Sequence, residues 1–205
     1  MKQKEIIFTA KVLSVMFTPF YLPILGLMIL FIFSYLSLLP LTYKLFLLLM
    51  FYLFTILLPT ALIRFYRRYQ GWTLIELGSR ERRVIPYIIS IFSYLVCYYI
   101  MTITHVPHFM GSILIAALVI QIACAMINLF VKISTHTAAI GGVTGSLLAF
   151  SVIFSFNPVW WLCITLLLAG MVGTSRMILR QHSLHQVVLG YLAGVLCSFV
   201  SVLLF

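Results

Sequence analysis

The chain has 205 residues, of which 64% are hydrophobic and only 8% are charged. A soluble domain carries about 25% charged residues, so this composition excludes an ordinary water-soluble fold and predicts an all-α, polytopic bundle of transmembrane helices. The net charge of +10 does not indicate nucleic acid binding, because Lys and Arg in so apolar a chain gather in loops that face anionic lipid headgroups. We expect residues 1–205 to form one transmembrane domain.

Acidic side chains are scarce: the chain contains three glutamates and no aspartate. Magnesium and calcium sites draw mainly on carboxylate oxygens, so we expect no metal cofactor. An aspartyl nucleophile is excluded, which leaves histidine as the available nucleophile for phosphate chemistry. The four cysteines lie singly in apolar stretches and are expected to pack as small hydrophobic side chains; they are Cys97, Cys124, Cys163 and Cys197.

Seven apolar stretches are long enough to cross a bilayer, which takes about 20 residues. In chain order they cover residues 6–33, 41–63, 84–104, 110–131, 136–156, 159–174 and 184–205. The first is expected to bend near Pro19 and Pro23. A bundle of six spans, with one stretch lying partly in the interface, is the alternative.

The cationic residues are distributed unevenly over this predicted topology. With seven spans, the N-terminus, the loop from Arg64 to Arg83 and the polar segments after residues 131 and 174 lie on one side. Twelve of the 13 Lys and Arg fall on that side, and only Lys44 falls on the other. Because cytoplasmic loops are rich in Lys and Arg, we expect this side to face the cytoplasm. A multi-pass protein of a bacterial inner (plasma) membrane is the expected localisation.

Two polar segments on that side interrupt the apolar pattern. Residues 173–190 read GTSRMILRQHSLHQVVLG, and residues 132–142 read KISTHTAAIGG. Ionisable side chains at the edge of a membrane span are costly, so they indicate function. Arginine forks match phosphate oxygens, and a helix beginning near Ser134 offers backbone N–H groups to an anion. Histidines on two segments can divide nucleophilic attack and protonation of a leaving alcohol.

The first of these segments carries a resemblance to a known family. SRMILRQH, from Ser175 and Arg176 to His182, resembles the SRxxxxxH motif of the type 2 phosphatidic acid phosphatase superfamily. The family's first motif, KxxxxxxRP, is matched only loosely by RERRVIP, where Arg82 or Arg83 precedes a proline at a different spacing. The resemblance defines a phosphatase-like core at residues 76–194.

The second segment resembles another motif of the same superfamily. KISTHT is similar to the PSGH motif, with Ser134 and His136 at the positions of its serine and histidine. Ile133 replaces the proline of that motif, and Thr135 replaces the glycine.

This resemblance implies an integral membrane phosphatase that hydrolyses a lipid phosphomonoester or an isoprenyl pyrophosphate through a phosphohistidine, without a metal. His182 would attack phosphorus, His136 would protonate the leaving group, and Arg176 would hold the phosphate oxygens. Further candidates for phosphate binding are Arg82, Arg83, Lys132, Ser134 and Ser175. Lys132 is added from its position, because the family motif does not assign it.

One position departs from the family in a way that matters chemically. The family places an aspartate four residues after the nucleophile, and this chain has Gln186 there. An amide oxygen can accept the imidazole N–H and fix its tautomer, but it stabilises an imidazolium little. We expect Gln186 to orient His182, and Glu76 or Glu81 from the loop is the hypothetical substitute for the missing carboxylate.

The expected partners are a lipid phosphate substrate and the surrounding membrane lipids. A phosphotransferase that uses the same histidine chemistry is one alternative function. A catalytically degenerate phospholipid-binding membrane protein is another. His105 and His108, near Pro107 on the other side, are predicted to be structural, whereas His185 could line the site or face headgroups.

Overall fold

The computed structural model describes residues 2–33, 38–72, 79 and 81–204. Regular structure in those ranges is helical, which confirms the predicted all-α bundle. In chain order the helices are α1 (Lys2–Met16), α2 (Leu22–Phe33), α3 (Leu41–Phe51), the π-helix η2 (Tyr52–Leu57), α4 (Leu58–Tyr69), the 3-10 turn η4 (Glu81–Arg83), α5 (Val84–Ile103), α6 (His108–Phe130), α7 (Thr135–Phe154), α8 (Val159–Ile178) and α9 (Leu184–Leu204).

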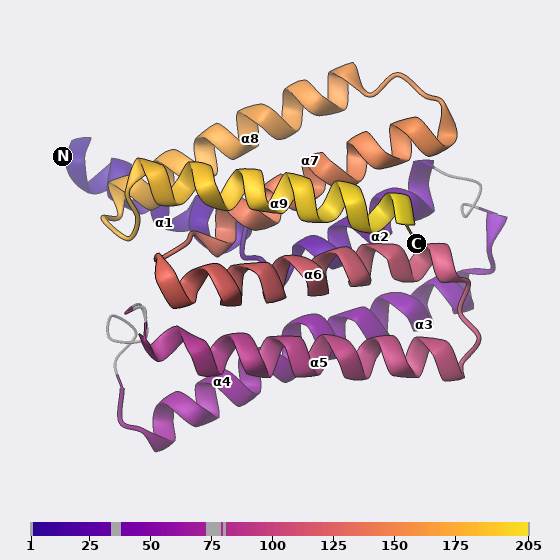
Figure 1. The fold of residues 1–205 in the computed structure, drawn as a ribbon, viewed down its shortest axis with the longest axis horizontal. Helices are drawn as coiled ribbons and strands as arrows, with labels where there is room; N and C mark the ends of the chain where they lie inside the picture. The colour runs from indigo at the N-terminus through magenta and orange to yellow at the C-terminus, as the bar shows by residue number, and fades with distance from the viewer. Residues whose placement is uncertain (1, 34–37, 73–78, 80, 205) are drawn as a thin grey trace.

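Six helical segments in the described ranges are long and apolar enough to cross a membrane: 41–69, 81–103, 110–130, 135–154, 159–178 and 184–204. The remaining predicted span, residues 6–33, is divided. α1 ends at Met16 and α2 begins at Leu22, because Pro19 between them has no backbone N–H with which to continue a helix. Together α1 and α2 run from the end of the bundle that holds the N-terminus to the opposite end (Figure 1).

The second span is longer than the sequence pattern predicts. A polar loop was expected from Arg64, but α4 continues to Tyr69. Arginine is a good helix former, so the basic character of this stretch does not end the helix. Gly71 ends the helix, because its φ of 67° is in the left-handed region and its N–H donates to the carbonyl of Arg68 in the last turn. Arg64, Arg67 and Arg68 therefore lie on the last turns of a helix.

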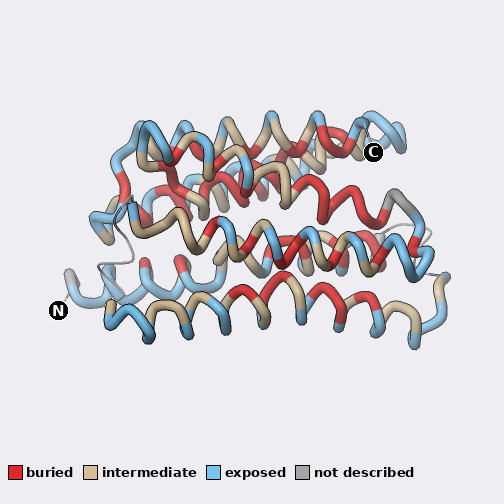
Figure 2. The backbone as a smooth tube through the Cα atoms, turned by 60° about the horizontal axis from the view of Figure 1, so that its bottom comes forward, coloured by how far each residue is buried: buried red, intermediate tan, exposed pale blue. Residues whose placement is uncertain are grey.

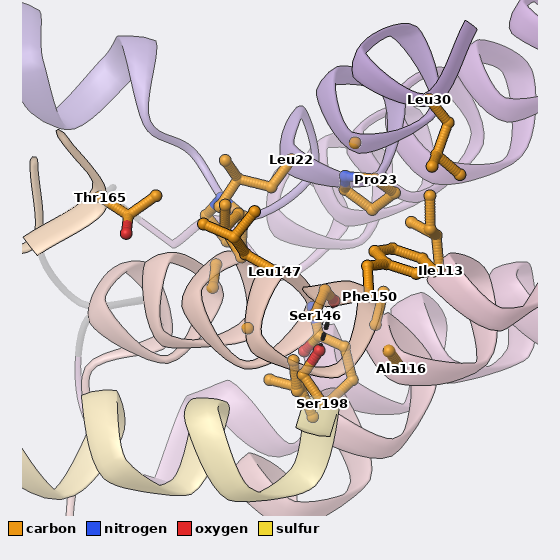
Figure 3. A pocket seen from close by; sticks show the side chains of 18 of the residues that line it. Leu22, Pro23, Leu30, Ile113, Ala116, Ser146, Leu147, Phe150, Thr165 and Ser198 are labelled. Carbon is orange, nitrogen blue, oxygen red and sulfur yellow. Dashed lines mark hydrogen bonds between the residues drawn. The ribbon is translucent and has the colours of Figure 1, made fainter. Parts of the chain in front are cut away.

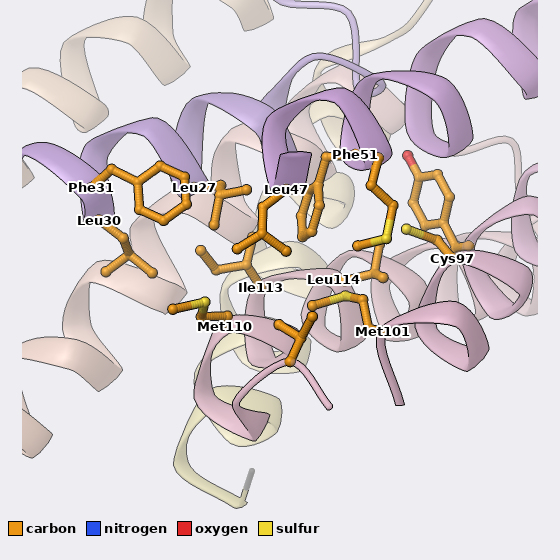
Figure 4. Packing of buried hydrophobic residues seen from close by; sticks show 13 residues of the cluster. Leu27, Leu30, Phe31, Leu47, Phe51, Cys97, Met101, Met110, Ile113 and Leu114 are labelled. Carbon is orange, nitrogen blue, oxygen red and sulfur yellow. The ribbon is translucent and has the colours of Figure 1, made fainter. Parts of the chain in front are cut away.

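The largest hydrophobic core lies between α2, α3, α5 and α6 (Figure 4). Leu27, Leu47, Phe51 and Leu114 are fully buried in it. The tube in Figure 2 shows buried positions on the inner sides of the helices and exposed positions on the outer sides. Many exposed side chains are large and apolar, and so large an apolar surface is typical of helices that face lipid.

α7 and α9 pack backbone against backbone. A Cβ atom added at Gly141, Gly145 or Gly194 would collide with main-chain atoms of the facing helix. Small residues thus let these two helices approach closely. Gly170 has no such contact: it is exposed on α8, and no atom lies within 4 Å of an added Cβ.

One end of the bundle gathers the N-terminus and the connections between α4 and α5, between α6 and α7, and between α8 and α9 (Figure 1). We call it the N-terminal end. This is the arrangement predicted from the span order. It brings the segments that carry Lys132, Arg176 and His182 together, whereas Lys44 lies on α3 near the opposite end.

Candidate active site

His182 lies in the short connection between α8 and α9, where it is buried. Its Nδ1 is 3.0 Å from Oε1 of Gln186, one turn into α9. The same oxygen lies 3.4 Å from the backbone N–H of Ser183, which precedes the first residue of α9. This is the reciprocal half of a capping box, in which a Gln at the third helical position reaches back to the N-cap.

The two contacts to Gln186 fix the form of the imidazole. A backbone N–H can only donate, so the Gln186 atom that faces Ser183 is the amide oxygen. That oxygen can only accept, so Nδ1 of His182 carries the proton. Nε2 of His182 then holds a lone pair, and it is buried with no hydrogen-bond partner among the described residues. These are the contacts that the orienting role predicted for Gln186 requires.

His136 lies in the first turn of α7, whose N-cap is Ser134. The Ser134 hydroxyl accepts weakly from the N–H of Thr137, at 3.5 Å. The N–H of Ser134 donates to the backbone carbonyl of Gln186 at 3.3 Å. This bond joins the start of α7 to the start of α9, so the segments that hold His136 and His182 are fastened to each other.

Arg176 lies in the last turn of α8 and is buried. Its Nη1 donates to the hydroxyl of Ser14 on α1 at 2.5 Å, and the Ser14 backbone hydrogen-bonds to the His136 ring. The sequence pattern gave no reason to place α1 at the site, because Ser14 belongs to no motif. The one feature that could have drawn attention to Ser14 is that it is a small hydroxyl residue in an otherwise apolar stretch.

The two candidate arginines of the 82–83 pair have different surroundings. Arg83 is half-buried, and its Nη1 donates to the carbonyl of Ile133 at 3.2 Å, directly beside the N-cap of α7. The guanidinium of Arg82 instead lies over the ring of Trp72, 4.6 Å from its centroid. Of the two, Arg83 therefore lies against the start of α7, and Arg82 lies against Trp72.

The charges of this cluster act on one another. Arg83, Arg176 and Lys132 all act electrostatically on His182, and Arg83, Arg176 and His182 act on His136. Burial, followed by the charge of Arg83, lowers the pKa of His182 from 6.5 to about 3. Burial and the charges of Arg83 and Arg176 lower the pKa of Lys132. The uncomplexed site therefore keeps His182 neutral.

We call these five side chains the anion pocket: Arg83, Lys132, His136, Arg176 and His182. Buried nitrogen atoms in it have no hydrogen-bond partner within the described part of the chain: Nδ1 of His136, Nε of Arg176 and Nε2 of His182. Buried polar groups are nearly always paired, so ordered water or a ligand is expected to pair with these atoms. The guanidinium groups of Arg83 and Arg176 and the ammonium group of Lys132 are donors, so a group that brings acceptor oxygens and negative charge suits them. The lone pair of His182 Nε2 is an acceptor and does not pair with such oxygens.

The carboxylates do not supply that charge within the described residues. Glu5 and Glu81 are both exposed, and neither acts on His182. Glu76, the other hypothetical substitute for the family's aspartate, lies outside the described residues. Gln186 is thus the side chain that the structure places against Nδ1 of His182.

Other predicted residues take positions away from the pocket centre. The hydroxyl of Ser175 donates to the carbonyl of Val172 at 2.7 Å within α8, so its side chain is engaged in its own helix. His185 is exposed on the first turn of α9. His105 lies at the opposite end of the bundle, exposed in the turn before α6. Of the four cysteines, Cys163 is exposed rather than packed.

Comparisons of the chain with protein-family models, with curated proteins and with solved structures find no match. The resemblance to type 2 phosphatidic acid phosphatases therefore rests on the motifs in the sequence and stays a prediction. The geometry that bears on it is the convergence of His136 and Arg176 with His182 at one end of the bundle.

Proposed function

We propose that this protein is an integral membrane phosphatase that hydrolyses a lipid phosphomonoester or an isoprenyl pyrophosphate through a phosphohistidine. The observation that carries the proposal is the state of His182. Gln186 holds its Nδ1–H, its unpartnered Nε2 has the lone pair, and the guanidinium groups of Arg83 and Arg176 lie beside it. A preorganised nucleophile beside fixed positive charge is what phosphoryl transfer requires.

In the first step, Nε2 of His182 attacks phosphorus and the bond to the leaving oxygen breaks. Arg83 and Arg176 stabilise the negative charge on the transferring phosphoryl oxygens. His136 donates a proton to the leaving oxygen through its unpartnered Nδ1. The negative charge of a bound phosphate favours the doubly protonated imidazole that gives this proton.

In the second step, water attacks the phosphohistidine. His136, now neutral, takes the proton from that water, and the N–P bond breaks to release inorganic phosphate and restore His182. Lys132 and the N–H groups at the start of α7 supply further positive charge to the departing phosphate. Each residue returns to its starting form, so the cycle closes.

The position of the site in the bundle favours a lipid substrate. The anion pocket lies at the N-terminal end, where six long apolar helices and their connections meet. A phosphate headgroup would enter from the membrane surface while its tail stays among the helices. We place this end at the cytoplasmic face of a bacterial inner membrane, because Lys and Arg concentrate there.

The proposal is tested by phosphate release from phosphatidic acid, phosphatidylglycerophosphate or a prenyl pyrophosphate in the presence of EDTA. Wild type should release phosphate, and His182→Ala should lose at least about a thousandfold of the rate, because the nucleophile is gone. His185→Ala is the matched control, since His185 is exposed on the same segment, and it should keep the rate. Equal rates for both variants would contradict the proposal.

One observation favours a second candidate function. Gln186 in place of a carboxylate gives little support to an imidazolium, which is a change expected of a degenerate lipid-phosphate-binding relative. Saturable binding of a lipid phosphate by wild type, with no release of phosphate and no transfer to an added alcohol, would favour this alternative. Transfer to the alcohol would favour a phosphotransferase.

A further inference from the structure

A cavity of about 590 Å³ lies between α2, α6, α7 and α8 (Figure 3). Its wall includes Pro23 from α2, Ile113 from α6 and Thr165 from α8. α7 lines it with a continuous stripe at helical spacing: Ala139, Val143, Ser146, Leu147, Phe150 and Phe154. The cavity therefore follows one face of a single helix.

The cavity lining runs along the whole of α7. It includes Thr135 and Phe154, the first and last residues of that helix. At 1.5 Å per residue these residues are about 28 Å apart along the helix axis. The hydrocarbon core of a bilayer is about 30 Å thick. Along α7, the lining is therefore longer than half the thickness of the hydrocarbon core.

The near end of the cavity adjoins the anion pocket. Thr135 directly precedes His136, and Ala139 lies one helical turn below His136 on the same side of α7. Pro19, from the connection that follows Ser14 and α1, also lines the cavity. A group held at the anion pocket could therefore continue directly into the cavity.

The cavity wall offers little to a polar occupant. The hydroxyls of Ser146 and Ser198 hydrogen-bond to each other at 2.6 Å (Figure 3). The Thr165 hydroxyl donates to the carbonyl of Leu162 at 3.1 Å. The side chains of Tyr94 and Gln121, which also line the cavity, interact with each other. The remaining lining is mainly aliphatic and aromatic, which suits an apolar guest. Its volume is in the range of about 300–1,000 Å³ that ligand sites occupy.

We infer that this cavity is a channel for one hydrocarbon chain of the lipid phosphate, extended from the anion pocket to the aromatic residues at the far end, Phe154 and Trp161. The inference rests on the proposed function for the identity of the headgroup. A chain in one leaflet spans about half of the 30 Å core, so the channel fits a single tail longer than one leaflet. Such a tail is typical of a polyprenyl phosphate and not of a two-chain glycerolipid.

The channel is tested by photo-crosslinking, which needs no turnover. A prenyl phosphate carries a diazirine near the phosphate, at mid-chain or at the tail end, and is incubated with the full chain and with His182→Ala in detergent. The labelled residues should move along α7 in order, from Ala139 through Leu147 to Phe154. Labels scattered over the outer surface of α7, including Val152, would overturn the inference. Unlabelled phosphatidic acid should displace the probe less well than unlabelled prenyl phosphate, and the reverse order would overturn the single-chain assignment.

A pair of variants tests the channel through activity. Leu147→Trp adds bulk halfway along the channel, whereas Val152→Trp adds it on the exposed side of the same helix. Leu147→Trp should lower kcat/KM for a long-chain substrate at least tenfold and leave a short-chain prenyl phosphate within twofold. Val152→Trp should change neither. An equal loss on both substrates with Leu147→Trp would contradict a channel for the tail.

The two proposals fail in different ways. Ordered crosslinks without any phosphate release would overturn the proposed hydrolysis and leave the channel in place. Phosphate release that depends on His182, together with labels only on outward-facing residues, would overturn the channel and leave the enzyme.

Discussion

Among single residues, Gln186 makes the side-chain contact that orients His182. Its amide oxygen fixes the tautomer and leaves Nε2 toward the anion pocket. It carries no charge, so in the proposed reaction it would stabilise an imidazolium or phosphohistidine only little. The low pKa of His182, about 3, follows from burial among cations with no carboxylate opposite Nδ1.

This predicts an unusual pH dependence. Because kcat/KM reports the free enzyme, wild type should show no acid limb near pH 6.5, the ordinary pKa of histidine. The same depressed pKa makes a stability prediction: below pH 6.5 the unfolded chain binds a proton that folded His182 does not. The stability contributed by this group is therefore present above pH 6.5 and is lost progressively as the pH falls toward 3.

Gln186→Asp should raise the pKa of His182 and stabilise the imidazole as it becomes positive. We expect kcat at neutral pH to rise about tenfold or more, with an acid limb of kcat/KM appearing at higher pH than in wild type. Gln186→Leu, which removes the acceptor, should lower kcat about tenfold or more. A pH–rate profile of the three proteins checks this. An unchanged profile in Gln186→Asp would mean that the side chain at 186 does not act on the nucleophile.

Ser14 supplies a second test at this scale. A hydrogen bond to a charged group contributes about 1.5–3 kcal/mol, so Ser14→Ala should lower kcat/KM about tenfold by releasing Arg176. Thr9→Ala is the control, because Thr9 is exposed on α1 and bonds only within that helix. Ser14→Ala should also lower the midpoint of thermal unfolding, because buried Arg176 loses a partner, whereas Thr9→Ala should stay close to wild type. If Ser14→Ala kept full activity, α1 would not position Arg176.

At the level of the helices, the contact between α7 and α9 sets the relation of the two histidines. His136 begins α7 and His182 precedes α9, and glycines let the helices approach closely. Gly190 contributes at the site itself: an added Cβ would lie 2.6 Å from the carbonyl oxygen of Ser134. The geometry of the pocket thus depends on glycines, because any larger residue at these positions would push the two helices apart.

Gly194→Ala should separate α7 from α9, because the added methyl would meet the backbone of Ala138. Overpacking of this kind costs about 1–3 kcal/mol, so the midpoint of thermal unfolding in detergent should fall and activity should fall with it. Gly170→Ala is the control on α8, where the space is open. Equal melting temperatures for the two variants would contradict the close packing of α7 on α9.

The helices also show what a sequence can and cannot predict. Length and hydropathy located every long span, because about 20 apolar residues suffice to identify one. They misplaced the end of α4, since Arg64 to Tyr69 is polar yet helical. Pro19 indicated the bend in the first span. It did not indicate that Ser14 would contact Arg176. That contact depends on tertiary packing between residues far apart in the chain.

The residues of the candidate site could be predicted in part. Motif spacing brought out His136, Arg176 and His182, and helical periodicity placed Gln186 beside His182. The choice between Arg82 and Arg83 was beyond the sequence, because adjacent residues differ only in the direction in which they point. In the structure, Arg82 lies over Trp72 and Arg83 lies at the pocket.

For the whole molecule, the distribution of charge predicts one orientation. Ser79, which follows α4, and Thr104, which follows α5, are both exposed and suit replacement by cysteine. α4 and α5 end at opposite ends of the bundle (Figure 1). With Cys163→Ser as background, an impermeant thiol reagent should label Thr104→Cys in intact cells. Ser79→Cys should be labelled only after permeabilisation. The opposite pattern would place the anion pocket on the outer face.

The central claim for the molecule is that His182 becomes phosphorylated at an anion pocket shared with His136. Rapid quenching after mixing with a ³²P-labelled lipid phosphate measures this directly. We predict a protein-bound label that is lost in acid, is stable in base, maps to His182 and is absent from His182→Ala. Phosphate release with no such label, or a label that persists in His182→Ala, would contradict it.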